Sequence, residues 1–373
     1  MSINNAIKLS HEFKNANFFL CLGGHHATFA AEEILCNSYF DAIVAGEGEF
    51  TILELVEALI DTNEIDQITG IYYQKNGKIY KTPSRKSVKQ LDTLPFPDRS
   101  IPMFCYENNI PLILNIISSR GCPYNCSFCD IAQFYRLGGE AWRCRSPRNF
   151  VDEIEMLTRK FPNYAIRICD DNFIGYKNQK ERIYQIAEEI IKRGIQIKFD
   201  IRCRADSFDI EKDKELIRLL KEAGLKSILL GVDGGCDTVL KIYNKRISAQ
   251  QNFQMIQFLR KFKLVLQMGY IMFNPYLTLS DLKDQLVFFI KTRQSLFYQM
   301  TNRLEIYPGI ALFQKLKEDG LIINYSHDNP YCYKYKDPRV KFLAENLSRV
   351  QPEMMVFDSL IQHIEFSISQ LRE

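Results

Sequence analysis

Apolar, β-branched runs alternate with helical patterns between about residues 110 and 310. In the helical patterns, apolar residues recur at three- and four-residue spacing. The apolar runs lie near residues 111–118, 164–169, 196–202, 226–231, 264–272 and 301–306. The helical patterns between them include residues 150–160, 180–193, 212–223, 250–261 and 279–291. Repeated strand–helix units predict a parallel α/β sheet, and six units fall short of the eight that close a barrel of roughly 250 residues.

A shorter alternation of the same kind precedes this core. Helical patterns are predicted over 6–15, 30–36 and 50–60, and short buried strands over 18–22 and 41–45. Two alternating runs around Asn76-Gly77 predict a hairpin over 68–81, and the proline-containing stretch 82–99 is typical of a linker. The end of the chain, 341–373, is helical in pattern. We therefore predict three parts: an α/β segment over 1–95, a core over 96–320, and a C-terminal tail over 321–373 that covers the substrate.

Composition limits the possible functions. The chain has 373 residues, of which 46% are hydrophobic and 25% charged, as in an ordinary globular protein. A net charge of +3 gives no electrostatic case for binding nucleic acid or an anionic membrane. No apolar run reaches the roughly 18 residues that span a bilayer, and the first residues lack the apolar core of a signal peptide. Eleven cysteines in such a chain indicate a reducing compartment, so we expect a cytoplasmic protein.

Three of those cysteines crowd into one loop directly after the first core strand. Cys122, Cys126 and Cys129 lie within eight residues. A closed structural zinc site needs four ligands, usually as two pairs, and the sequence contains no second Cys-x2-Cys pair. Three thiolates on a four-iron cubane would instead leave one iron open to a small molecule. The plain alternative is a loop of three buried or zinc-bound cysteines.

The spacing Cys-x3-Cys-x2-Cys, with Phe128 before the last cysteine, resembles the signature of the radical S-adenosylmethionine (radical SAM) superfamily. The resemblance implies a partial (β/α)6 barrel that is open on one side. It also implies a [4Fe–4S] cluster on Cys122, Cys126 and Cys129, whose open iron chelates S-adenosylmethionine. One electron, from a reduced flavodoxin- or ferredoxin-type donor, then releases a 5′-deoxyadenosyl radical. Phe128 would pack beside the adenine.

Other parts of the resemblance lie at predicted strand ends, where such barrels place their chemistry. Asp170 and Asp171 follow the second core strand, where the superfamily places acidic residues against the ammonium of S-adenosylmethionine; the alternative is an Asx turn. Arg204 follows the third strand and suits a carboxylate clamp, or an ordinary surface salt bridge. Asp233 follows the fourth strand, where glutamate is usual in the family, and residues 244–245 also match the family pattern.

The N-terminal segment carries a second resemblance. "LGGHHAT…AEEIL…FDAIVAGEGEF" is similar to the second half of the cobalamin-binding domain found in one subgroup of the superfamily. The first half of that domain and its Asp-x-His-x-x-Gly loop have no counterpart, and His25 and His26 lie on the Gly-Gly turn that the family also has. The sequence therefore predicts a truncated, Rossmann-like segment and disfavours cobalamin as a cofactor.

The function predicted from these motifs is hydrogen abstraction from a peptide or other natural product, ending in epimerisation or oxidative rearrangement. The alternative is a cobalamin-dependent radical SAM methyltransferase. An RNA-modifying enzyme would need a basic appended domain, and none is visible. In the tail, Cys332 is a candidate hydrogen-atom donor, and the alternative is a cysteine packed as a small hydrophobic residue.

Overall fold

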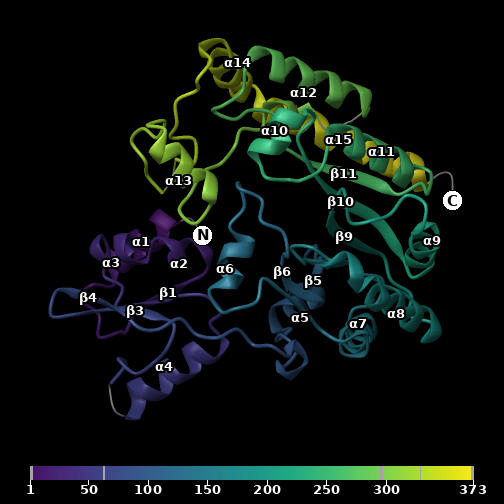
Figure 1. The fold of residues 1–373 in the computed structure, drawn as a ribbon. Helices are drawn as coiled ribbons and strands as arrows, with labels where there is room; N and C mark the ends of the chain where they lie inside the picture. Colours follow the sequence, from purple (N-terminus) through teal and green to yellow (C-terminus); the bar gives the residue numbers. More distant parts are fainter. Residues whose placement is uncertain (1–2, 62–63, 294–296, 328, 371–373) are drawn as a thin grey trace. The chain divides into compact units, whose positions relative to one another are not determined.

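The computed structural model describes residues 3–61, 64–293, 297–327 and 329–370 (Figure 1). The chain divides into two compact units, and each is assembled from three separate segments. The first unit comprises Met1–Lys89, Gly121–Arg143 and Glu305–Tyr333, and the second comprises Gln90–Arg120, Cys144–Leu304 and Lys334–Glu373. The cysteine loop therefore belongs to the first unit, together with the N-terminal segment. The linear three-part division stays a prediction.

The second unit is built on a parallel five-stranded sheet with the order β11-β10-β9-β8-β5. Its strands are β5 (Leu114–Ile116), β8 (Ile166–Ile168), β9 (Phe199–Arg204), β10 (Leu225–Asp233) and β11 (Val265–Tyr270). Its longer helices are α7 (Pro147–Lys160), α8 (Lys180–Lys192), α9 (Lys214–Glu222), α11 (Ala249–Arg260), α12 (Leu279–Lys291), α14 (Pro338–Arg349) and α15 (Gln351–Gln370). This confirms the predicted α/β fold with a parallel sheet and a helical C-terminus. The sixth predicted strand differs, because residues 301–306 contribute only an isolated parallel bridge between Arg303 and Phe273.

Local sequence signals explain where the helices of this unit begin. Ser146 caps α7 ahead of Pro147, and its hydroxyl accepts a hydrogen bond from Asn149 N. Ser248 and Thr278 form capping boxes at the starts of α11 and α12. Each of these helices buries one apolar face, as the three- and four-residue spacing predicts.

The first unit contains a four-stranded sheet with the order β1-β2-β3-β4. Its strands are β1 (Cys21–Gly23), β2 (Ala42–Val44), β3 (Ile71–Lys75) and β4 (Lys78–Lys81), and its helices include α1 (Ile3–Glu12), α2 (His25–Phe29), α3 (Ala31–Cys36), α4 (Glu49–Asp61), α6 (Ile131–Arg136) and α13 (Ala311–Glu318). β1 and β2 are parallel, whereas β3 and β4 form the predicted hairpin, with positive φ at Asn76 and Gly77. The buried strand predicted over 18–22 is wrong: β1 begins only at Cys21, on the edge of the sheet, and none of its residues is buried. Phe18 is 65% exposed.

The chain passes from the second unit to the first within β6 (Ser119–Gly121) and returns within β7 (Trp142–Cys144). α5 (Ser100–Glu107) lies in the stretch just after the predicted linker, where no helix was expected. No helix within the described ranges is long and apolar enough to cross a membrane.

Two glycines that follow helices of the second unit test how tightly the backbone packs there. Gly194 and Gly224 both have positive φ, 64° and 110°. A Cβ on Gly224 would lie 2.1 Å from the carbonyl oxygen of Ile197, whereas nothing lies within 4 Å of one on Gly194. We expect Gly194→Ala to lower the free energy of unfolding by about 1 kcal/mol, the cost of the left-handed backbone. Gly224→Ala should cost on the order of 3 kcal/mol or more, because backbone must also move. Urea denaturation followed by circular dichroism measures both, and equal losses would contradict the steric argument.

Candidate active site

The cysteine loop of the first unit presents three half-buried thiols, none of them in a disulfide. Gly121 opens the loop at φ 83°, and a Cβ there would lie 2.1 Å from the carbonyl oxygen of Ala141, so only glycine fits. Cys129 N donates to Cys126 O at 3.2 Å and tightens the turn. Burial raises the pKa of the Cys129 thiol, and Cys126 and Cys122 raise it further as like charges. The three sulfurs therefore share one neighbourhood.

The donor chemistry of this loop suits an iron–sulfur cluster. Cys122, Cys126 and Cys129 are soft thiol donors, and all three are half-buried and outside any disulfide. In the described part of the chain, no group of three or more His, Cys, Asp or Glu residues is arranged to hold one metal ion. The cluster on these cysteines and the zinc alternative therefore both stay predictions.

In the second unit, the two aspartates after β8 have different surroundings. The Asp170 carboxylate is 1% exposed and accepts three hydrogen bonds: from Ser118 N at 2.6 Å, Ser118 Oγ at 2.5 Å and Ser119 Oγ at 2.6 Å. It thereby fastens the residues after β5 to the end of β8. Asp171 is exposed instead. Of the predicted pair, Asp171 is therefore the better placed to meet a ligand.

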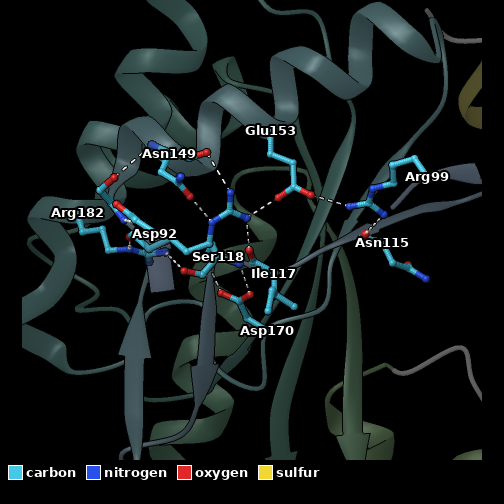
Figure 2. Close-up of polar contacts among 11 residues, drawn as sticks. Asp92, Arg99, Asn115, Ile117, Ser118, Asn149, Glu153, Asp170 and Arg182 are labelled. Atoms are coloured by element: carbon cyan, nitrogen blue, oxygen red, sulfur yellow. Dashed lines mark hydrogen bonds and ion pairs between the residues drawn. The ribbon is translucent and has the colours of Figure 1, made fainter. Parts of the chain in front are cut away.

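Buried arginines hold the same strand end (Figure 2). Arg182, 6% exposed, donates to the carbonyl oxygens of Ser118 at 2.8 Å and Arg145 at 3.1 Å. Arg145 donates to Ile117 O at 2.9 Å and forms an ion pair with Glu153. Burial lowers the pKa of Arg182, and carbonyl oxygens supply most of its hydrogen bonds. These contacts fix the backbone immediately before the residues that lead into the cysteine loop.

Glu153 extends this network in the other direction. Its side chain is 1% exposed and lies between two guanidinium groups, those of Arg145 and Arg99, with Arg99 Nη2 at 2.6 Å. Arg99 also donates to Asn115 O at 3.0 Å, on β5 itself (Figure 2). A buried carboxylate between two cations is a demanding arrangement, because removal of the carboxylate would leave two nearly buried guanidinium groups without their anion.

The ends of β9 and β10 are joined by a second polar cluster. Arg204 is 6% exposed and donates to Lys245 O at 2.6 Å and to Asp206 Oδ1 at 2.8 Å. Lys245 forms an ion pair with Asp233 and donates to Gly231 O at 3.1 Å. Arg204 thus makes a salt bridge, as the alternative interpretation expected, but in the interior rather than on the surface.

Asp233 occupies an unusual backbone position. Its φ is 61°, and the pairing of β10 with β11 shifts register between Gly231 and Asp233. A non-glycine residue in the left-handed region next to a bulge is costly and often marks a functional position. Buried amides hold the following loop: Asn252 donates to Val232 O and Gly234 O, both at 3.2 Å. The carboxylate is therefore presented from a rigid turn.

The remaining predicted residues lie in the first unit. Phe128 is half-buried in the cysteine loop. Cys332 is 1% exposed, and burial raises the pKa of its thiol. This burial favours the alternative of a small hydrophobic packing residue, and a role as hydrogen-atom donor stays a prediction. His25 and His26 begin α2 on the Gly-Gly turn.

Several residues near these groups were not predicted as site residues. Ser118 and Ser119 hold Asp170, Lys245 pairs with Asp233, and Asp130 directly follows Cys129. Residues 244–245 match the family pattern in the sequence, so Lys245 could have been predicted as a site residue. The serines carry no pattern that distinguishes them from other strand-end residues.

The aspartate pair gives a test of these assignments. We expect Asp170→Asn to lower the free energy of unfolding by about 1–3 kcal/mol, because an amide group cannot accept from all three donors. Asp171→Asn, the matched control one residue away, should leave stability within about 0.5 kcal/mol of the parent. Thermal or urea unfolding of the two variants measures this difference. A stable Asp170→Asn protein would show that the buried hydrogen bonds are dispensable.

Comparisons with known proteins agree with this arrangement. Residues 116–286 match the sequence model of the radical SAM superfamily. An uncharacterized methyltransferase of Pyrococcus horikoshii is 28% identical over 375 aligned residues, which cover 95% of this chain and 77% of that protein. The anaerobic magnesium-protoporphyrin IX monomethyl ester cyclase of Rubrivivax gelatinosus is 31% identical over 267 residues, 69% of this chain and 46% of that enzyme. The chain thus spans about half the length of the cyclase.

Two solved structures share the fold. The cobalamin-dependent S-adenosylmethionine radical enzyme OxsB, with aqua-cobalamin and S-adenosylmethionine bound, has a TM-score of 0.75 at 23% identity, over 92% of this chain and 55% of its own. The radical S-adenosylmethionine methyltransferase TsrM from Kitasatospora setae, with cobalamin and a [4Fe–4S] cluster bound, has a TM-score of 0.67 at 16% identity, over 90% of this chain and 65% of its own.

These structures correct the prediction about cobalamin. The sequence has no counterpart of the first half of the cobalamin-binding domain or of its Asp-x-His-x-x-Gly loop, and cobalamin was therefore predicted to be disfavoured; this prediction is wrong. Both of those proteins, whose folds match most of this chain, have cobalamin bound.

Proposed function

Because the chain belongs to the radical SAM superfamily, we propose that it is a cobalamin-dependent member that methylates an unactivated carbon of a small natural product or peptide. The observation that carries the radical assignment is the loop of three half-buried cysteines without a fourth ligand in the motif. The methyl-transfer assignment is supported by the relative named a methyltransferase, which aligns with 95% of this chain.

The residues of the chain have separate tasks in this proposal. Cys122, Cys126 and Cys129 would hold the [4Fe–4S] cluster, which supplies the electron that cleaves S-adenosylmethionine. Arg204, Asp233 and Asp171 are the candidates to bind the charged groups of S-adenosylmethionine, with Phe128 beside the adenine and Asp170 in a supporting position. The protein must also receive electrons from a reductant, orient the substrate and exclude water.

The first unit offers a surface suited to cobalamin. Gly24 and Gly46 follow the ends of β1 and β2 with φ of 101° and 82°, and nothing lies within 4 Å of a Cβ built on either. Neither glycine is required by packing, so the open backbone is available for close approach of a ligand. A neighbouring cavity of about 260 Å³, lined in part by Thr28 and Gly46, has room for only part of so large a molecule.

A second candidate is a cobalamin-dependent radical reaction without methyl transfer. It is favoured by the 31% identity to the magnesium-protoporphyrin IX monomethyl ester cyclase of Rubrivivax gelatinosus. Epimerisation or oxidative rearrangement of a peptide has weaker support, since the two sequence relatives reported above are named a methyltransferase and a cyclase.

The cluster assignment is tested by replacing each loop cysteine with alanine. After anaerobic reconstitution, we expect each variant to lose the four-iron content and the release of 5′-deoxyadenosine, because two thiolates cannot retain the cubane. Cys105→Ala is the matched control, since Cys105 lies outside the loop on α5, and it should keep both. Iron content and nucleoside release that persist in any loop variant would refute the assignment.

The cobalamin assignment is tested by adding hydroxocobalamin to the purified protein under reducing conditions. We expect a corrin absorption spectrum that stays with the protein on gel filtration, and a product that gains one CH2 unit when candidate substrates are supplied. A bound corrin with a product that loses hydrogen or keeps its mass would favour the second candidate. Failure to retain corrin would overturn both.

A further inference from the structure

The parallel sheet of the second unit has one buried, apolar face and one face that is more exposed. On the buried face, Ile201 of β9 and Leu230 of β10 are 1% and 0% exposed. The strand residues that alternate with them lie on the other face, called here the open face, and include Asn115, Arg167, Asp200, Arg202, Leu229 and Gln267. Parallel sheets are nearly always covered on both faces, so the open face is a place for a ligand.

Strand register arranges the open face in rows across the sheet. Arg167 of β8 pairs with Asp200 of β9 in one row. Two residues further along β9, Arg202 pairs with Leu229 of β10, which in turn pairs with Gln267 of β11. Because β9 is the central strand of the five, Arg202 lies near the middle of the open face.

The next row on β10 and β11 consists of bare backbone. Gly231 pairs there with Gly269. A Cβ on Gly231 would lie 3.6 Å from its nearest neighbour, and one on Gly269 would lie 3.4 Å from its own, which are ordinary contact distances. Packing therefore requires neither glycine, and the missing side chains leave room for a ligand beside Arg202.

Arg202 is a cation without a counter-ion on this face. The other charged strand residues of the open face are paired: Arg167 with Asp200 at 3.2 Å, Asp233 with Lys245, and Arg204 with Asp206 at 2.8 Å. Arg202 is exposed, and its guanidinium group forms no ion pair or hydrogen bond with any other residue that the structure describes. A guanidinium group in this state suits the two oxygens of a carboxylate or phosphate.

The position of Arg202 along the strands separates it from the candidates for binding S-adenosylmethionine. Asp233 ends β10, and Asp171 follows the end of β8. Leu229, the register partner of Arg202, precedes Asp233 by four residues, which is on the order of 13 Å along a strand at about 3.3 Å per residue. An anion on Arg202 would thus lie deeper in the sheet than a ligand at the strand ends.

We propose that Arg202 binds an oxyanion of the substrate, a carboxylate or a phosphate, while the body of the molecule lies over the backbone of Gly231 and Gly269. The exposed amide of Gln267 offers a further hydrogen-bonding group on the same face. This inference deepens the proposed function and rests on it for the identity of the ligand as substrate. It restricts the substrate to an anionic natural product or peptide, because a neutral molecule would cover the guanidinium group without compensating its charge.

A thiol on the open face provides the probe. Cys169 is half-buried and lies two residues beyond Arg167, on the segment that continues β8 beside β9. Iodoacetate carries a carboxylate and iodoacetamide does not, so an anion site beside Cys169 accelerates alkylation by iodoacetate alone. Burial raises the pKa of the Cys169 thiol, but both reagents attack the same thiolate, so this effect cancels in the ratio of their rates. Peptide mass spectrometry measures the ratio at each cysteine of the purified chain.

In the parent protein, we expect the iodoacetate-to-iodoacetamide ratio at Cys169 to exceed that at Cys105 on α5 roughly tenfold, because Arg202 concentrates the anion. Arg202→Gln should lower the ratio at Cys169 to that of Cys105, and Arg202→Lys should keep part of the preference. Inorganic phosphate should compete in the parent protein and lower its ratio. Arg218→Gln is the matched control, since it removes an exposed arginine from α9, and it should change nothing.

Equal ratios at Cys169 in the parent and Arg202→Gln proteins would overturn the inference. If Cys169 reacts with neither reagent, Leu229→Cys provides a thiol at the register position beside Arg202, and the same comparison decides. In protein with a reconstituted cluster, loss of the preference on addition of S-adenosylmethionine alone would assign the anion site to that molecule and also overturn the inference. The labelling itself needs no cluster. A parent protein that shows the preference but assembles no cluster would instead refute the proposed function.

Discussion

The conformation of the cysteine loop depends on contacts from outside the loop. Eight residues with three thiols cannot bury an apolar core of their own, and apart from the short turn at Cys126 their backbone has to be held by neighbours. Two contacts within the first unit hold it. Gly121 has no Cβ, so the carbonyl oxygen of Ala141 can pack close to it, and Leu312 N donates to Ser127 O at 2.8 Å. Asp130, tied to His25, closes the loop at its other end. These contacts from outside the loop hold its backbone in one conformation.

In the second unit, buried polar groups hold the backbone at the strand ends. The end of β5 is held by the carboxylate of Asp170 and the guanidinium groups of Arg182 and Arg145, all nearly buried. Such groups are costly to remove from water and tolerate little displacement once paired. They give the strand ends a fixed geometry that an apolar core of similar size does not impose. The left-handed backbone of Asp233 is a local strain that such surroundings can sustain.

The correction concerning cobalamin shows how a motif can mislead by its absence. The Asp-x-His-x-x-Gly loop provides one ligand to cobalt in the family, yet a corrin is large and is held along much of its surface. Two proteins that share the fold over most of this chain have cobalamin bound, although the first half of the cobalamin-binding domain has no counterpart in this sequence.

The sequence by itself determined the parallel sheet of the core, the positions of the long core helices α7, α8, α9, α11 and α12, the hairpin at Asn76-Gly77 and the cysteine loop. These follow from periodicity, capping residues and spacing, which act over a few residues. It could not show that residues 1–89, 121–143 and 305–333 form one unit, since that depends on contacts between segments far apart in the chain.

For the same reason, the tertiary structure alone distinguished Asp170, saturated by the serines after β5, from the exposed Asp171, although the two are neighbours of the same type. It alone placed His25 beside Asp130. The role of a polar side chain depends on the partners that the fold brings to it, and short-range sequence patterns do not identify partners that are distant in the chain.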